Sequence, residues 1–78
     1  MKLSIKYFAS MRERMSCAEQ DVELAVAAIS ITELWREHLS TEPLPANTLL
    51  AVNMTYCDGD TVLHDGDEVA FFPPVTGG

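Results

Sequence analysis

The chain has 78 residues and a formal net charge of −7, and these two properties exclude several classes of protein. A single domain of this size has little room for a deep catalytic pocket. Its acidic surface repels the phosphates of nucleic acids and of anionic lipids. We therefore expect no nucleic-acid partner and no membrane association, and a protein that binds or carries rather than one that catalyses alone. A basic protein surface is its natural complement.

The two cysteines, Cys17 and Cys57, lack the spacing of a disulfide framework or of a metal site. They are expected to be free thiols in a reducing compartment. The sequence shows no charged and apolar leader and no apolar run of transmembrane length. We therefore expect a cytoplasmic protein. The acidic residues of the second half lack the full spacing of a calcium-binding loop, so no metal site is predicted.

Two segments near the N-terminus alternate apolar and polar residues, which is typical of β-strands. They are residues 2–8 and residues 21–27, and the second strand is predicted to run antiparallel to the first. Side chains two apart point to the same face of a strand. The residues expected to point inward are Leu3, Ile5, Tyr7, Val22, Leu24 and Val26.

Two helices are predicted from capping boxes, in which a Ser and a Glu three residues later satisfy the first backbone groups of a helix. Ser10 and Glu13 predict a short helix that ends at about Cys17. Ser30 and Glu33 predict a longer helix over residues 31–39. The side chains expected to pack this helix against a sheet are Ile31, Leu34 and Trp35.

The rest of the sequence predicts a loop and further extended segments. Pro43 and Pro45 prevent the helix from continuing, so a loop is expected to about residue 48. Gly66, between two aspartates, predicts a tight turn with a positive φ at the glycine. The extended segments are residues 49–53, 61–63 and 68–72.

The predicted order is strand, short helix, strand, helix, strand, turn-rich segment and strand. This order places the chain in the α+β class, with one sheet covered on one face by the longer helix. The first and last strands are expected to lie side by side. We expect residues 1–72 to form one domain and residues 73–78 to form an extended C-terminal tail.

The tail is unusual in its composition. Pro73 and Pro74 remove two backbone donors, so the last strand cannot continue and the chain leaves the sheet in an extended form. Six extended residues reach at most about 20 Å, far enough to enter the active site of another protein. Glycines lack a Cβ and fit a narrow channel. The remaining tail residues are Val75, Thr76, Gly77 and Gly78.

This tail predicts chemistry at the carboxylate of Gly78. A free carboxylate is a poor acyl donor, but ATP can convert it to an acyl-adenylate that a sulfur nucleophile then turns into a thiocarboxylate. The second half of the chain contains no lysine whose amine would compete for the activated end. A terminal Gly-Gly alone is weak evidence, whereas the preceding Phe-Phe-Pro-Pro-Val strengthens this interpretation.

Residues 65–78, Asp-Gly-Asp-Glu-Val-Ala-Phe-Phe-Pro-Pro-Val-Thr-Gly-Gly, resemble the C-terminal signature of the small subunit of molybdopterin synthase. Residues 7–13, Tyr-Phe-Ala-Ser-Met-Arg-Glu, and residues 50–53, Leu-Ala-Val-Asn, extend the resemblance over most of the chain. The loop at 40–48 is shorter and richer in proline than in some relatives, which concerns the fit to a partner. The resemblance implies a ubiquitin-like β-grasp fold, in agreement with the predicted order of elements.

The resemblance also implies a function. The family carries sulfur as a C-terminal glycine thiocarboxylate, so Gly78 matches the modified position and Gly77 its neighbour. The implied partners are an ATP-dependent adenylating enzyme, a sulfur donor protein and the large subunit of molybdopterin synthase. The large subunit uses the sulfur to build the dithiolene of molybdopterin from cyclic pyranopterin monophosphate. The chain itself would bind no cofactor, since ATP is used by the adenylating partner, and would be no enzyme alone.

Two other functions begin with the same adenylation of Gly78. One is a sulfur carrier for another thiolated product, such as thiamine. The other is a ubiquitin-like modifier that is joined to lysines. The Phe-Phe-Pro-Pro-Val approach to the tail favours the molybdopterin carrier.

Phe8 and Phe72 fall on the polar face of their strands and predict an apolar docking patch beside the tail. The alternative is that a loop partly covers these rings. Arg12 lies near this patch and is a candidate to pair with an acidic group of a partner, or is simply solvated. The predicted partner-binding residues are Phe8, Arg12, Phe72, Pro73, Pro74, Val75 and Thr76.

Overall fold

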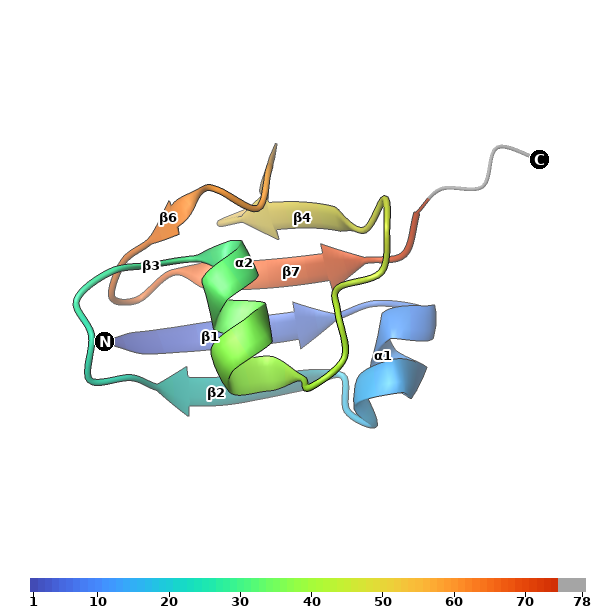
Figure 1. Ribbon diagram of the computed structural model, residues 1–78, viewed down its shortest axis with the longest axis horizontal. Coiled ribbons are helices and arrows are strands. Elements are labelled where there is room, and N and C mark those ends of the chain that lie inside the picture. Colours follow the sequence, from blue (N-terminus) through green and yellow to red (C-terminus); the bar gives the residue numbers. More distant parts are fainter. Residues whose placement is uncertain (75–78) are drawn as a thin grey trace.

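The computed structural model describes residues 1–74, which form a five-stranded sheet, a two-stranded sheet and three short helical segments (Figure 1). The strands are β1 (Lys2–Tyr7), β2 (Glu19–Glu23), β3 (Ile29–Ser30), β4 (Leu49–Val52), β5 (Thr55–Cys57), β6 (Val62–Leu63) and β7 (Glu68–Phe72). The helical segments are α1 (Ser10–Met15), α2 (Ile31–Leu34) and the π-helical turn η1 (Trp35–Leu39), which continues α2.

The first and last strands form the centre of the large sheet. Its strand order is β2-β1-β7-β4-β5, and only β1 and β7 run parallel, with Ile5 opposite Val69. This confirms the predicted pairing of the first and last strands and the antiparallel pairing of the first two. Because β1 and β7 run in the same direction, their last residues lie at the same end of the sheet, where the chain continues from Phe72 to Pro73 (Figure 1).

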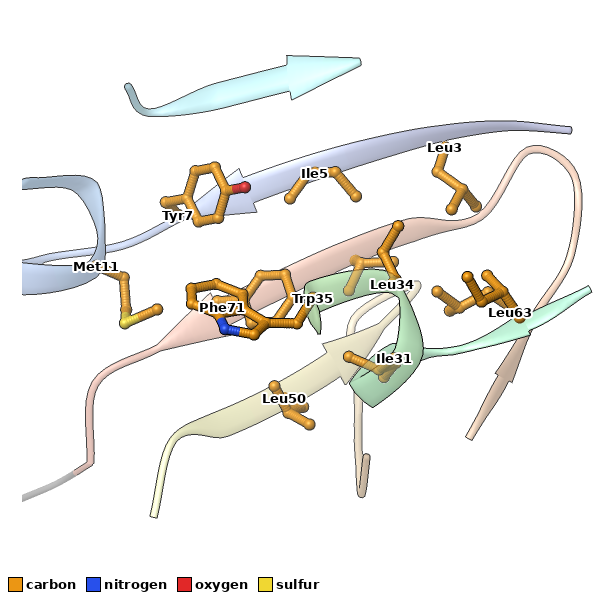
Figure 2. Packing of buried hydrophobic residues seen from close by; sticks show 12 residues of the cluster. Leu3, Ile5, Tyr7, Met11, Ile31, Leu34, Trp35, Leu50, Leu63 and Phe71 are labelled. Atoms are coloured by element: carbon orange, nitrogen blue, oxygen red, sulfur yellow. The ribbon is translucent and has the colours of Figure 1, made fainter. Parts of the chain in front are cut away.

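The core lies between the large sheet and the segment formed by α2 and η1. The capping box at the start of α2 is present: Glu33 N donates to Ser30 Oγ at 3.1 Å, and Ser30 N donates to Glu33 Oε1 at 3.4 Å. Figure 2 shows the side chains of this segment meeting those of the sheet, with Trp35 against Phe71. The largest fully buried side chains are Trp35, Tyr7, Phe71, Leu3, Ile5, Ile31, Leu34, Leu63 and Val69.

These features confirm the predicted α+β class and the β-grasp fold, in which a mixed sheet holds a helix on one face. Gly66 has the expected positive φ, 88°, in the turn before β7. Among residues 1–74, no helix is long and apolar enough to cross a membrane.

The predicted bounds of the second strand, residues 21–27, are wrong: the strand lies earlier in the chain. It begins at Glu19 and ends at Glu23, so Val26 lies beyond it and is 46% exposed instead of pointing inward. The strand ends there because its partner β1 begins at Lys2, which pairs with Glu23. The short strands β3 and β5 were not predicted, since neither is long enough to show an alternating pattern.

The capping box predicted at Ser10 is also wrong. Ser10 is the first residue of α1, and the N-cap is Ala9, which offers no side-chain hydrogen bond. The helix ends at Met15, two residues before the predicted end, because Ser16 adopts a left-handed conformation with φ 60° and ψ 23°. The tight connection from β1 leaves only Phe8 and Ala9 before the helix begins.

Candidate functional site

Two aromatic rings meet where the central strands end. Phe8 follows β1, and its N–H donates to the carbonyl of Phe71 at 3.1 Å. Phe72 is the last residue of β7. The rings of Phe8 and Phe72 are stacked, with centroids 4.5 Å apart and planes at 7°. The structure therefore brings these two predicted residues together, directly before the tail begins at Pro73.

Tyr56 adds a third ring to this pair. Its ring centroid lies 6.0 Å from that of Phe72, at an interplanar angle of 57°. Tyr56 is 69% exposed and Phe8 is 37% exposed, so solvent reaches the group. We call Phe8, Phe72 and Tyr56 the aromatic cluster. It joins the ends of two central strands to the edge strand β5.

Two buried alanines, Ala51 at 5% and Ala70 at 8% exposure, lie on the same face of the sheet as the rings. Ala70 of β7 pairs with Ala51 of β4, and Ala51 pairs with Tyr56. Since side chains directly opposite in a sheet share one face, the two alanines lie on the same face as Tyr56. On the next strand Lys6 pairs with Ala70, and its ammonium contacts Glu68 at 3.6 Å. Charged residues thus border the aromatic cluster, whose exposed rings form an apolar area suited to protein docking.

Arg12 lies in α1, exposed to solvent, four residues after Phe8. Within the described part of the chain, residues 1–74, its guanidinium forms no ion pair. The structure therefore places a cation on α1, the helix that follows Phe8 in the chain. Its pairing with an acidic group of a partner stays a prediction.

Only the first part of the tail can be described. Pro73 is half-buried and Pro74 is exposed, and neither belongs to a strand. Pro74 has no N–H to donate, so β7 ends beside the aromatic cluster. Val75, Thr76, Gly77 and Gly78 lie outside the described residues, and the roles predicted for them stay predictions.

Within the described residues, the cysteines and acidic residues form neither a disulfide nor a metal-binding group. Cys17 and Cys57 are both free and half-buried. Between Met1 and Pro74, no group of three or more His, Cys, Asp or Glu side chains is placed to hold a metal ion. The thiol of Cys17 donates to Gln20 Oε1 at 3.5 Å. Asp65 Oδ1 accepts a hydrogen bond from the backbone N–H of Lys2 at 2.7 Å, and Asp67 Oδ2 accepts one from the backbone N–H of His64 at 2.9 Å.

Tyr7 lies in the core next to Phe8 in sequence, and its hydroxyl is unusual. The side chain is 1% exposed, and the hydroxyl has no hydrogen-bond partner among residues 1–74. Burial raises the pKa of Tyr7 to about 12, and the neighbouring Cys17 adds to this effect. Burying a hydroxyl without a partner costs free energy, so this group destabilises the folded state.

Replacement of Tyr7 by Phe is therefore expected to raise the free energy of unfolding at neutral pH by about 1 kcal/mol. A second effect concerns alkaline pH. In the unfolded chain the phenol ionises near its ordinary pKa of 10.0, whereas in the folded chain it stays protonated to about 12. The unfolded state thus loses its proton first, and stability falls as pH rises from 10 to 12, by on the order of 2 kcal/mol.

Urea denaturation of the wild type and of Tyr7→Phe between pH 7 and pH 12 measures both effects. The variant is expected to lack the tyrosine part of the alkaline loss. Tyr56→Phe, which removes an exposed hydroxyl, serves as the matched control. A Tyr7→Phe variant that is less stable at pH 7 would show that the hydroxyl has a stabilising partner.

Tyr56 is the member of the site that sequence reasoning missed. The segment around it was interpreted as turn-rich, so no strand and no outward face were assigned to it. The available signal was Asn53, a residue that tolerates a positive φ, between two short runs of strand-forming residues. Asn53 and Met54 form the two-residue turn that joins β4 to β5, with φ values of 49° and 71°.

Known proteins resemble this chain over nearly its whole length. The ThiS family model matches residues 5–78. The molybdopterin synthase sulfur carrier subunit of Escherichia coli (strain K12) is 36% identical, over 97% of this chain and 99% of the relative. The protein of the same name from Haemophilus influenzae is 34% identical over the same shares. The structure of the putative molybdopterin converting factor subunit 1 from Pyrococcus furiosus superposes with a TM-score of 0.71 at 31% identity, covering 96% of this chain and 99% of that one.

Proposed function

The chain belongs to the ThiS family, and on this premise we propose that it is a sulfur carrier in the biosynthesis of the molybdenum cofactor. The observation that carries the proposal is its similarity, along 97% of its length, to sulfur carrier subunits of molybdopterin synthase. The family match includes Gly77 and Gly78. We further propose that the chain is cytoplasmic and acts within a complex rather than as an enzyme alone.

The proposed chemistry takes place at the carboxyl group of Gly78. On the adenylating partner, a carboxylate oxygen attacks the α-phosphate of ATP, pyrophosphate leaves, and an acyl-adenylate forms. A persulfide of a donor protein then attacks the acyl carbon and AMP leaves, which yields an acyl disulfide. A thiol cleaves this disulfide, so that the donor cysteine ends in a disulfide with that thiol and the thiocarboxylate is released. In molybdopterin synthase this sulfur is transferred to cyclic pyranopterin monophosphate, and water restores the carboxylate.

The described residues contribute positioning rather than chemistry. Phe72 is hydrogen-bonded into the centre of the sheet through β7, so the origin of the tail is held by strands on both sides. The aromatic cluster lies at this origin and would dock on the large subunit, while the residues from Pro73 to Gly78 reach its active site. Arg12 would pair with an acidic group of that subunit.

The proposal can be tested by loading the purified chain with sulfur at Gly78 and mixing it with the large subunit and cyclic pyranopterin monophosphate. Intact-mass spectrometry is expected to show that sulfur is replaced by oxygen only when both components are present. Omission of the precursor is the control. If the thiocarboxylate persists in the complete mixture but is consumed by a thiamine-type precursor, or if the chain instead becomes attached to lysines, the proposed function is wrong.

A further inference from the structure

The large sheet has two faces with different surroundings. The segment formed by α2 and η1 packs on one face, where Ile5 and Phe71 are completely buried (Figure 2). Side chains alternate along a strand, so the neighbouring residues Ser4 and Phe72 point to the other face. We call this second face the outer face. The aromatic cluster lies at one end of it, which leaves the part of the outer face around Ser4 without an assigned role.

Three residues in register form a row across this part of the outer face. Ser4 of β1 lies directly opposite Asp21 of β2 on one side and directly opposite Glu68 of β7 on the other. Neighbouring strands are about 4.8 Å apart, so the backbones of the two acidic residues are separated by about 10 Å, with the small serine between them. We call Asp21, Ser4 and Glu68 the acidic notch. A depression of about 400 Å³ lies there, lined by Ser4, Lys6, Glu19, Asp21 and Glu68.

The carboxylates around this depression outnumber the cations that could neutralise them. Asp21 is exposed and forms no ion pair among residues 1–74. The ammonium of Lys6 contacts Glu68 at 3.6 Å, and both side chains remain partly exposed. Glu19, the residue opposite Lys6 on β2, has no ion pair within the same described part of the chain. Three carboxylates and one ammonium therefore line a depression that is open to solvent.

Protection of a free sheet edge explains only part of this arrangement. Charged side chains on an edge strand prevent unwanted pairing with other chains, which accounts for the acidic residues of β2. It does not account for Glu68, because β7 lies in the middle of the sheet. It also does not account for a small residue, Ser4, between two carboxylates. The row has the shape and the charge to receive a cationic side chain from another protein.

We propose that the acidic notch binds an arginine side chain of the large subunit, beside the aromatic cluster. A guanidinium is planar and has five N–H donors, so it can bridge two carboxylates that a compact ammonium cannot both reach. The notch precedes Phe8 on β1 and Phe72 on β7 by four residues, or about 13 Å. An interface of standard size, about 800 Å² per partner, covers both the notch and the aromatic cluster.

The charge contact would give this interface its specificity. Aromatic surfaces accept many partners, whereas a guanidinium between two carboxylates fixes which protein docks and in which register. The register matters because the tail begins at Pro73, directly after the docked Phe72. The inference rests on the proposed function, since it takes the large subunit as the partner.

Two substitutions disable the notch in different ways. Asp21→Asn removes a carboxylate, and Ser4→Lys fills the notch with an ammonium of the chain itself. We expect each to raise the dissociation constant for the large subunit about five- to tenfold at about 0.1 M salt, and much less at about 1 M salt, where charges are screened beyond about 3 Å. Asp60→Asn is the matched control, expected to change affinity less than about twofold. It also removes one exposed carboxylate, but next to Gly59, whose carbonyl accepts a hydrogen bond from the N–H of Thr32 in α2.

A measurement on the free chain separates this inference from the proposed function. Titration with acetyl-arginine-amide is expected to shift the NMR amide signals of Ser4, Asp21 and Glu68 more than titration with the neutral acetyl-citrulline-amide. Asp21→Asn should abolish this difference. If the difference is seen but the wild type does not bind the large subunit, the proposed function is wrong, while the notch is still shown to take arginine.

Three results would overturn the inference. The first is equal shifts with the two probes. The second is unchanged affinity of both Asp21→Asn and Ser4→Lys for the large subunit. The third is a wild-type dimer in sedimentation that Asp21→Asn dissociates, because the occupant of the notch would then be a second copy of this chain.

Discussion

Addition of a single alanine after Gly78 is expected to abolish sulfur transfer and to leave the fold intact. The added residue moves the reactive carboxyl group by one residue, up to about 3.5 Å, and gives it a Cβ beside the reacting carbon. Displacements of about 1 Å already cost large factors in rate when reacting atoms must be aligned. The domain itself should not respond, because the buried core residues found among residues 1–74 all precede Pro73.

The measurement is sulfur release to cyclic pyranopterin monophosphate by the extended chain, with pyrophosphate release as a separate report on adenylation. A deletion of Gly78 is expected to fail in the same way. Val62→Ala, a substitution in the separate two-stranded sheet, leaves the tail unchanged and is the matched control. Thermal unfolding should be the same for all four chains. Full activity of the extended chain, with its mass showing that the added alanine is still present, would refute the role of Gly78.

Replacement of Phe72 by Ala is expected to weaken binding to the large subunit by about 1 to 3 kcal/mol, the range of an interface hot spot. Phe72 contacts both other rings of the aromatic cluster, so its loss removes their common neighbour. Phe8→Ala should have a smaller effect of the same kind. Since the rings of Phe8 and Phe72 are stacked, the two substitutions together should cost less than the sum of their separate effects.

Calorimetric titration with the large subunit measures these affinities, and urea denaturation of the free variants measures stability. Val62→Ala is a suitable control, because Val62 is also an exposed apolar residue, at 50%, but belongs to the separate two-stranded sheet. It should leave affinity unchanged. A Phe72→Ala variant that loses much stability but binds normally would make the ring part of the core and would contradict the docking surface.

The parts of the fold that could be predicted are those with strong local patterns. The alternation in residues 2–8 and 68–72 predicted the two central strands, and the capping box of Ser30 and Glu33 predicted the start of α2. At Ser10 the same kind of pattern was misleading. There the turn from β1, closed by Met11 N on Phe8, starts the helix before a serine side chain can cap it.

The aromatic cluster was only partly predictable, because it depends on pairing between distant strands. Phe8 and Phe72 could be assigned to an outer face from their positions in two alternating segments. Tyr56 could not, since its strand has three residues and owes its place to pairing with β4.

The central position of β7 has a consequence for the synthesis of this protein. The strand next to β1 in the sheet is the last one along the chain, so β1 and β4 have no common neighbour until Phe72 has been made. A chain interrupted on the ribosome before that point lacks the middle of its sheet and the buried residues Val69 and Phe71. Pairing between such distant segments is also a late event in folding. Every folded copy therefore already contains β7, the strand that leads to the tail.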